Sequence, residues 1–297
     1  MTVLVTGAAG FLGIRLVTEL LANSCEVIAT DRCPLPDQLS SDKRITWIER
    51  DIAKDGMVAD EICSVDTVFH LAGATLGAGQ DELLFLEANE MTTVKLLQAC
   101  AEHVKKVIFA SSQVVYGDVN HTAVTEKFSV CGLGSAYACS KFNSENWLKW
   151  FQKKYGGIYI SLRYCGFIEG GGIIDYMLDQ ALNNKAIEVY SKGSVVRDYL
   201  PVEKGIAAFM LAYNGKLSFG FEAFNIGSGQ LIRTSEMAAL ICTEANSQSE
   251  IIFSSIPAPQ TDFVFCIDKA KSQLGFEPGS LSNAIRDYVQ LKKSGKS

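Results

Sequence analysis

Short apolar runs rich in β-branched residues alternate with longer amphipathic stretches along the first half of the chain. An unbroken apolar run is typical of a parallel strand buried on both faces, whereas a helix repeats its apolar residues roughly every three to four positions. The short runs predict strands at residues 3–6, 26–30, 66–71, 106–111 and 158–163. The stretches between them predict helices within residues 11–21, 87–103 and 136–151.

This alternation predicts an α/β fold with a doubly wound, mostly parallel Rossmann sheet. Beyond about residue 165 the pattern breaks into glycine-rich turns and shorter elements. We therefore expect a dinucleotide-binding Rossmann domain at residues 1–165, to which 206–230 returns. A smaller C-terminal substrate-binding lobe is expected from residues 166–205 and 231–297.

Composition removes several classes of partner from consideration. The chain has 297 residues and a formal charge of −6, with no dense basic cluster, which argues against nucleic acid. No stretch approaches about 18 unbroken apolar residues, so no membrane segment is expected. The 9 cysteines form no C-x-x-C and the 3 histidines are dispersed, which argues against a disulfide framework and a metal site. With no recognisable leader before the first strand, these features predict a soluble, cytoplasmic protein.

A glycine-rich turn joins the first predicted strand to the first helix. Gly7, Gly10 and Gly13 lie in V-L-V-T-G-A-A-G-F-L-G, where Phe11 and Leu12 open the helix. Glycines let such a turn be tight and let the backbone approach a pyrophosphate, while the helix N-terminus supplies partial positive charge. The turn therefore predicts a dinucleotide site, although close packing of the helix on the strand would also call for glycine.

The ends of the next two strands bear on the identity of the dinucleotide. Asp31 ends the second strand, and a carboxylate there can accept both ribose hydroxyls and would repel a 2′-phosphate, which favours NAD over NADP. Arg32 is the opposing observation, because a guanidinium there could bind that phosphate. Asp51 and Ile52 follow a third strand at residues 44–50 and are candidates to flank the adenine ring, or to form an ordinary solvated turn.

Two tyrosines each stand four positions before a lysine, Tyr137 before Lys141 and Tyr288 before Lys292. Residues four apart on a helix share a face, so either lysine could lie near its tyrosine. The spacing does not decide between a proton-transfer pair and two ordinary helical residues.

The order of short motifs along the chain resembles the extended short-chain dehydrogenase/reductase family, in particular its nucleotide-sugar epimerases, dehydratases and ketoreductases. The motifs that carry the resemblance are T-G-A-A-G-F-L-G, Asp31, D-I at 51–52, H-L-A-G at 70–73, Asn89, S-S-Q-V-V-Y-G at 111–117, Tyr137 with Lys141, R-D-Y-L-P-V at 197–202, F-N-I-G-S-G at 224–229 and L-G-F-E-P at 274–278.

The resemblance implies that Ser112, Tyr137 and Lys141 are catalytic and that Tyr288 is structural. It implies that Leu71, Ala72, Gly73 and Asn89 also contact the cofactor and that Ser112 and Gln113 contact substrate. A free phenol has a pKa of about 10 and is a poor base at neutral pH. The Lys141 ammonium and the nicotinamide charge would favour the Tyr137 phenolate, and Ser112 could share the substrate proton.

The residues after Ser112 argue against two of the reactions known in the resembled family. The resemblance implies an Asp-Glu pair there in 4,6-dehydratases and a Cys in 3,5-epimerase/reductases, but this chain has Gln113 and Val114. The remaining reaction of the resembled family is hydride transfer at one carbon, which we expect to be C4 of a nucleotide-activated hexose. We expect a 4-epimerase with bound NAD, with a 4-ketoreductase as the alternative. A dinucleotide-binding regulator without turnover is a further class, which the intact Ser112, Tyr137 and Lys141 disfavour.

Substrate recognition departs from the family pattern. Arg197 matches the arginine that grips the nucleotide diphosphate, or it could pair with Asp198. Gly166 stands where the family has a diphosphate-binding Asn, and residues 257–262 contain no Arg where a second one is expected. A dehydrogenase of a small, non-nucleotide polyol or uronate therefore stays open. The resemblance also implies a homodimer, for which Trp147, Trp150 and Phe151 would suit the interface or, equally, the core.

Overall fold

The protein is described by a computed structural model covering residues 1–75, 77, 79, 81–117, 119–258 and 261–294. It divides into two compact units. Unit 1 comprises Met1–Asp118, Phe128–Tyr164 and Ile206–Phe224, and unit 2 comprises Val119–Lys127, Cys165–Gly205 and Asn225–Ser297. Among the described residues, no helix has the length and apolar character that crossing a membrane requires.

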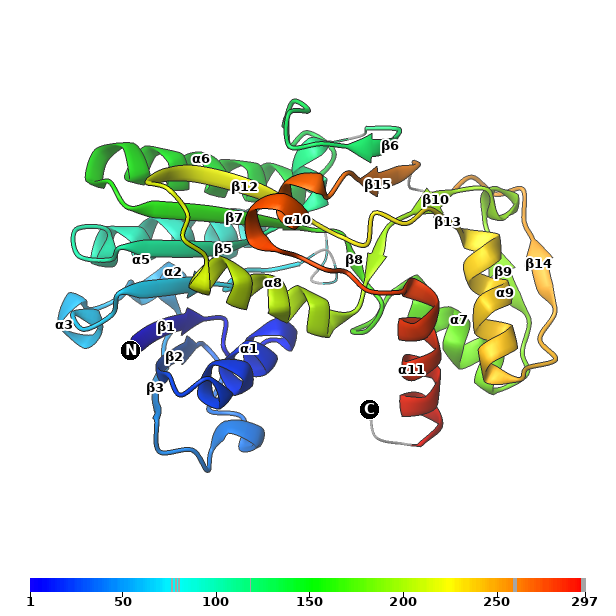
Figure 1. Ribbon diagram of the computed structural model, residues 1–297, viewed down its shortest axis with the longest axis horizontal. Helices are drawn as coiled ribbons and strands as arrows, with labels where there is room; N and C mark the ends of the chain where they lie inside the picture. Colours follow the sequence, from blue (N-terminus) through cyan, green and yellow to red (C-terminus); the bar gives the residue numbers. More distant parts are fainter. Residues whose placement is uncertain (76, 78, 80, 118, 259–260, 295–297) are drawn as a thin grey trace. The chain divides into compact units, whose positions relative to one another are not determined.

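Unit 1 is built on a seven-stranded sheet with the strand order β12-β7-β5-β4-β1-β2-β3 (Figure 1). Its strands are β1 (Thr2–Thr6), β2 (Glu26–Asp31), β3 (Ile45–Glu49), β4 (Thr67–His70), β5 (Lys106–Ser112), β7 (Ile158–Tyr164) and β12 (Gly220–Ile226), the last of which ends in unit 2. The pairs β1–β2, β1–β4, β2–β3, β4–β5 and β5–β7 are all parallel. The predicted doubly wound, mostly parallel sheet is confirmed.

Helices cover both faces of this sheet. They are α1 (Phe11–Ala22), η1 (Asp37–Leu39), α2 (Ile52–Asp55), α3 (Ala59–Ile62), α4 (Glu82–Phe85), η3 (Leu86–Met91), α5 (Thr92–Cys100), η4 (Gln113–Tyr116), α6 (Ala136–Tyr155) and α8 (Val202–Asn214), whose first turn belongs to unit 2. Neighbouring residues of a strand point to opposite faces. Val68 of β4 accordingly packs in a core cluster with Leu96 and Leu97 of α5, while the Phe69 ring lies 6.2 Å from that of Phe209 on α8. Burial on both faces explains why these strands read as unbroken apolar runs.

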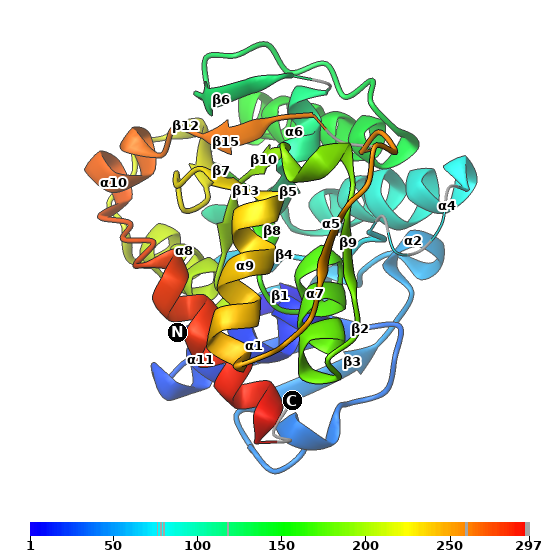
Figure 2. The same cartoon turned by 90° about the vertical axis from the view of Figure 1, so that its right-hand side faces the viewer.

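Unit 2 has its own core, formed mainly by three helices and a short strand. Figure 2 shows α7 (Ile173–Leu182), α9 (Thr234–Ala245) and α11 (Leu281–Lys293) next to one another, and Met177, Ile241 and Ile285 bring their apolar faces together. The other elements are β6 (His121–Val124), β8 (Gly166–Phe167), β9 (Ile187–Val189), η5 (Ser191–Gly193), β10 (Val196–Arg197), β11 (Tyr199–Leu200), β13 (Ile232–Arg233), β14 (Ile251–Phe253), β15 (Phe263–Phe265) and α10 (Asp268–Leu274).

Candidate functional site

The glycine turn lies where the strand order of the sheet reverses, between β1 and β4. Gly7 has a φ of +71°, and a Cβ on it would come within 2.6 Å of the Ala72 nitrogen that follows β4. A Cβ on Gly13 would lie 2.1 Å from the Gly7 oxygen. Both positions therefore require glycine on packing grounds. Ligands of open α/β sheets bind at the carboxyl ends of the strands at such a reversal.

The first turn of α1 faces this edge of the sheet without a polar side-chain cap. Gly10 is the N-cap residue and supplies no side-chain hydrogen bond, and no acidic residue lies in the first turn that Phe11 and Leu12 begin. The amide hydrogens of an uncapped helix start can bind an anion. The turn has the chemistry that a pyrophosphate needs.

Asp31 is positioned directly beside the glycine turn. Its Oδ2 accepts a hydrogen bond from the Ala9 nitrogen at 3.0 Å, and its Oδ1 accepts one from the Cys33 nitrogen at 3.1 Å. Arg32 is exposed. Asp51 caps α2 by accepting from the Lys54 nitrogen at 3.3 Å, and the Ile52 side chain is buried in the core. Asp51 is therefore a half-buried helix cap rather than the solvated turn residue considered from the sequence, and its contact with adenine stays a prediction.

Three segments converge on Gly73, which follows Leu71 and Ala72 after β4. A Cβ on Gly73 would lie 2.5 Å from Asn89 Oδ1 and 3.6 Å from Lys141 Nζ. Asn89 belongs to a π-helical turn, and its Oδ1 accepts from the Ala74 nitrogen at 2.7 Å while its Nδ2 donates to Ser140 Oγ at 2.7 Å. Single π-helical turns inside helices are common at functional sites. Asn89 thus ties the end of β4 to α6.

Ser112 lies at the end of β5 and Tyr137 in the first turn of α6, and Ser112 is near enough to Tyr137 to lower the pKa of its phenol. Tyr137 is 8% exposed, and burial raises the pKa of its phenol by more than Ser112 lowers it. Ser111 instead donates to Glu145 Oε1 at 2.7 Å. Of the two adjacent serines, Ser112 is therefore the one that reaches Tyr137. Gln113 follows it as the first residue of η4.

Lys141 is buried one helical turn after Tyr137. Its Nζ donates to the Ala110 oxygen at 3.0 Å and lies 4.7 Å from the centre of the Phe109 ring. Burial lowers the pKa of Lys141 to about 8, and the nearby Glu145 carboxylate acts in the opposite direction. The ammonium is therefore still the main form at neutral pH. Ser112, Tyr137 and Lys141, the three residues predicted to be catalytic, thus come from the end of β5 and the first two turns of α6.

Tyr288 has a different environment in unit 2. It is buried on α11, and its hydroxyl donates to the Asp175 carboxylate, which also forms an ion pair with Lys292 at 3.3 Å. Burial, and then the Asp175 hydrogen bond, raise the pKa of Tyr288. This second Tyr-x-x-x-Lys pair links α11 to α7.

Arg197 lies on β10 in unit 2. Its Nη1 donates to the Thr261 oxygen at 2.8 Å, and burial lowers its pKa. The Asp198 carboxylate accepts from Ser228 Oγ at 2.7 Å and from the Phe265 nitrogen at 3.1 Å instead of pairing with Arg197. Within the described part of the chain, Arg197 forms no ion pair with a carboxylate. Pro259 and Gln260, in the stretch expected to hold a second arginine, lie outside the described residues.

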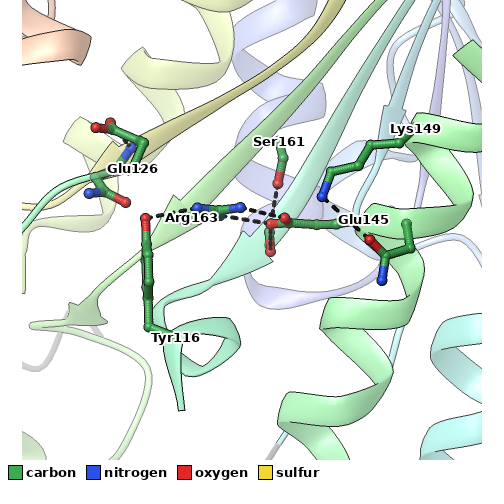
Figure 3. A network of polar contacts seen from close by, with 9 residues as sticks. Tyr116, Glu126, Glu145, Lys149, Ser161 and Arg163 are labelled. Carbon is green, nitrogen blue, oxygen red and sulfur yellow. Dashed lines mark hydrogen bonds and ion pairs between the residues drawn. The ribbon is translucent and has the colours of Figure 1, made fainter. Parts of the chain in front are cut away.

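Sequence reasoning did not find a buried polar network that joins the helix of Tyr137 and Lys141 to the sheet. Figure 3 shows the Glu145 carboxylate on α6 bound to Arg163 and Ser161 of β7. His70 is also buried, and its ring nitrogens lie 2.8 Å from Thr6 Oγ1 and 2.8 Å from Thr93 Oγ1. Burial, with the Lys141 charge, lowers the pKa of His70 to about 3, so it is neutral. The available sequence signal was that Glu145 follows Lys141 by four positions, so that it shares a face of α6 with Tyr137 and Lys141.

Relatives with known names or structures extend along nearly the whole chain. A putative UDP-glucose 4-epimerase of Methanocaldococcus jannaschii is 27% identical, over 98% of this chain and 98% of the relative. A dTDP-4-dehydro-6-deoxyglucose reductase of Escherichia coli is 28% identical, over 93% of this chain and 92% of the relative.

Solved structures give the same picture. The UDP-glucose 4-epimerase of Thermotoga maritima, solved with UDP-glucose, superimposes with a TM-score of 0.87 at 25% identity, covering 100% of both chains. The UDP-glucuronic acid 4-epimerase of Bacillus cereus, solved with NAD, has a TM-score of 0.86 at 25% identity, again over 100% of both.

The model of one protein family matches residues 3–227 of this chain, from the first strand to the end of β12. This match confirms the resemblance predicted from the motifs. The chain belongs to the NAD dependent epimerase/dehydratase family.

Proposed function

We propose that this chain is an NAD-dependent 4-epimerase of nucleotide sugars, acting at C4 of a hexose carried by UDP. The observation that carries the proposal is that Ser112 at the end of β5 is near enough to Tyr137 to lower the pKa of its phenol, with Lys141 one helical turn after Tyr137 and beside Gly73. Relatives named as UDP-glucose 4-epimerases match nearly the whole chain, which supports UDP-hexose as the substrate class.

The residues at the carboxyl edge of the sheet fit NAD. The glycine turn at Gly7 has no room for a Cβ, and the start of α1 offers amide donors for a pyrophosphate. The Asp31 carboxylate, next to that turn, would accept the ribose hydroxyls and disfavour a 2′-phosphate. Asn89 would hold Gly73 in place beside the nicotinamide end, where Lys141 would hold the ribose hydroxyls. When bound, NAD would accept a hydride from C4 and return it to the opposite face of the sugar.

Tyr137 would take the proton of the C4 hydroxyl and later give it back to the same oxygen. Its pKa is raised by burial in the protein without ligands, so the phenolate needs a neighbouring positive charge. Lys141, which is mostly an ammonium at neutral pH, supplies one such charge from the same face of α6. Ser112 would donate to the substrate oxygen and keep the phenol aligned with it.

Arg197 and Gln113 would contact the substrate. A half-buried guanidinium without a carboxylate partner among the described residues is suited to a diphosphate, which accepts two parallel hydrogen bonds from it. Gln113 directly follows Ser112, so its amide would lie near the sugar hydroxyls.

We also propose that the enzyme is a cytoplasmic homodimer that pairs α6 and the helix before it with their copies. Trp147 and Trp150 on α6 are 39% and 49% exposed, and Met91 at the end of η3 is 41% exposed. Phe151 is buried in the core instead. The 9 cysteines are all free, which fits a reducing compartment.

A nucleotide-sugar 4-ketoreductase is the second candidate. The Escherichia coli relative named as a dTDP-4-dehydro-6-deoxyglucose reductase favours it, as does Arg32 beside Asp31. Gly166 stands where the family has a diphosphate-binding Asn, and a Cβ there would already lie 3.2 Å from the Tyr199 ring. The lack of this diphosphate contact favours a third candidate, a dehydrogenase of a small polyol or uronate.

The test is to denature the purified protein, identify any nucleotide it releases, and assay it with UDP-glucose, UDP-glucuronic acid and their C4 epimers. Stoichiometric NAD with interconversion of one such pair, and no need for added cofactor, is the expected result. Empty protein that turns over only a 4-keto sugar with added NADPH would overturn the epimerase in favour of the reductase. Activity on a free polyol or uronate without any affinity for UDP would favour the dehydrogenase.

A further inference from the structure

The inner face of α6 carries a third functional group beyond Tyr137 and Lys141. Glu145 follows Lys141 by one helical turn and is fully buried. Its Oε1 accepts hydrogen bonds from Ser111 Oγ at 2.7 Å and Ser161 Oγ at 2.7 Å. Arg163 donates to the same carboxylate from Nε at 3.0 Å and from Nη2 at 2.6 Å (Figure 3). The carboxylate thereby joins α6 to β5 and β7.

Arg163 extends this connection to the far side of Ser112. Its Nη1 donates to the Tyr116 hydroxyl at 2.8 Å, and its guanidinium lies 4.9 Å from the centre of the Tyr116 ring. Ser111 and Tyr116 stand on either side of the segment that contains Ser112 and Gln113. The ion pair therefore holds both ends of that segment to the helix that bears Tyr137.

The same carboxylate is the charge that acts on Lys141. The groups near the ammonium are the Phe109 ring and the Ala110 oxygen from β5, His70 from β4, Gly73 after β4, and Glu145 from α6. His70 is neutral, and the Tyr137 phenol is neutral without ligands. Glu145 thus supplies the negative charge that opposes the effect of burial on Lys141.

Stability gives little reason for such an ion pair in the core. Removing two charges from water costs about as much as their attraction returns, and apolar residues of similar volume are often at least as stable. The Glu145–Arg163 pair is about as buried as a pair can be, with side chains 0% and 4% exposed. The pair contacts Ser111 and Tyr116, which flank Ser112, and its carboxylate acts on Lys141. These contacts indicate a role in the reaction.

We propose that the Glu145–Arg163 ion pair is a positioning element that holds Ser112 against Tyr137 and keeps a negative charge one turn behind Lys141. The inference rests on the proposed function, because it assumes that Ser112, Tyr137 and Lys141 carry the proton. Neither Glu145 nor Arg163 touches substrate in this role. Both act through the residues that do.

The chain offers a matched pair of variants for the positional half of this proposal. Ser111→Ala and Ser161→Ala each remove one buried hydroxyl that donates to Glu145 Oε1 at 2.7 Å, but only Ser111 adjoins Ser112. We expect Ser111→Ala to lower kcat by about tenfold with KM unchanged, and Ser161→Ala to change kcat by less than about twofold. Equal losses of kcat at equal losses of unfolding free energy would show that the network only stabilises the fold and would overturn the proposal.

Glu145→Gln tests the electrostatic half. Removing the negative charge disfavours the Lys141 ammonium, so we expect the alkaline limb of the kcat–pH profile to move to lower pH. A purely structural role would lower kcat equally at every pH, which would contradict the proposal. If Glu145→Gln does not fold, the two serine variants decide the question.

A readout without substrate separates this proposal from the proposed function. The titration of the Lys141 amine, followed by nuclear magnetic resonance and assigned by its loss in Lys141→Met, should move to lower pH in Glu145→Gln than in the wild type. If the wild-type protein epimerises no nucleotide sugar but this shift is present, the proposed function fails and the charge coupling stands. An unchanged Lys141 titration in an active enzyme would sink the coupling.

Discussion

Tyr137 and Tyr288 show at the scale of single residues why spacing could not identify the reactive group. Both stand four positions before a lysine on a helix and both are buried. The Tyr137 hydroxyl meets Ser112 at the end of β5, whereas the Tyr288 hydroxyl is bound to Asp175, which Lys292 also holds. The difference lies in long-range neighbours that a local pattern does not contain.

Phenylalanine at each position gives a matched comparison. We expect Tyr137→Phe to lower kcat by about 10³-fold or more, because the proton has no other acceptor of suitable geometry, while bound NAD is retained. Tyr288→Phe should leave kcat within about twofold and cost about 1 kcal/mol of unfolding free energy, through the lost hydrogen bond to Asp175. Steady-state kinetics and urea unfolding measure both effects. Full activity in Tyr137→Phe would remove Tyr137 from the mechanism.

Lys141 should make stability depend on pH in the alkaline range. Its pKa is about 8 in the fold, against about 10.4 for an unfolded lysine, so between these values the unfolded chain binds more protons. Lys141 should therefore contribute a rise of about 3 kcal/mol to the free energy of unfolding between about pH 8 and about pH 10, which is measured as the difference between the wild type and Lys141→Met. Lys141→Met keeps the aliphatic length and should lose this slope. Parallel curves for the wild type and Lys141→Met would mean that Lys141 titrates normally in the fold.

At the scale of elements, the sequence predicted well what depends on local pattern. Strands covered by helices on both faces are continuous apolar runs, and the glycine turn follows from Gly7, Gly10 and Gly13. The π-helical turn that contains Asn89 leaves no comparable trace, because one extra residue in a helical turn changes no composition. The Glu145–Arg163 pair was missed since its two residues come from different elements and meet only in the folded sheet.

Alanine substitutions in the glycine turn test which of its glycines is required by packing. A Cβ at Gly13 would meet the Gly7 oxygen at 2.1 Å, and neither backbone can move away cheaply, so we expect Gly13→Ala to cost about 3 kcal/mol or more. At Gly10 the nearest atom is the same oxygen at 3.1 Å, and the cost should be about 1 kcal/mol. Urea unfolding compares the two variants. Equal costs would mean that the turn relaxes as a whole and that Gly13 is not demanded by packing.

At the scale of the molecule, each unit is assembled from separate stretches of the chain. Unit 1 contains every candidate cofactor residue together with Ser112, Tyr137 and Lys141, while Arg197 lies in unit 2. The expectation from the sequence is that residues 206–230 return to the Rossmann domain; in the structure unit 1 includes Ile206–Phe224, and unit 2 includes Val119–Lys127. Nothing local in that short stretch differs from an ordinary loop. The role of unit 2 in substrate binding stays a prediction.

The proposed homodimer gives the last prediction. Trp150 is 49% exposed on α6, and its ring packs edge-on against Trp147, so a glutamate there would place a charge within the proposed contact. We expect Trp150→Glu to be monomeric by sedimentation at concentrations where the wild type is a dimer. Phe253→Glu on β14 is the control, since Phe253 is 56% exposed and belongs to unit 2, whereas α6 belongs to unit 1. Because all residues of the proton path belong to one chain, the monomer should keep bound NAD and lose little kcat. A dimer that survives Trp150→Glu but not Phe253→Glu would move the interface to unit 2.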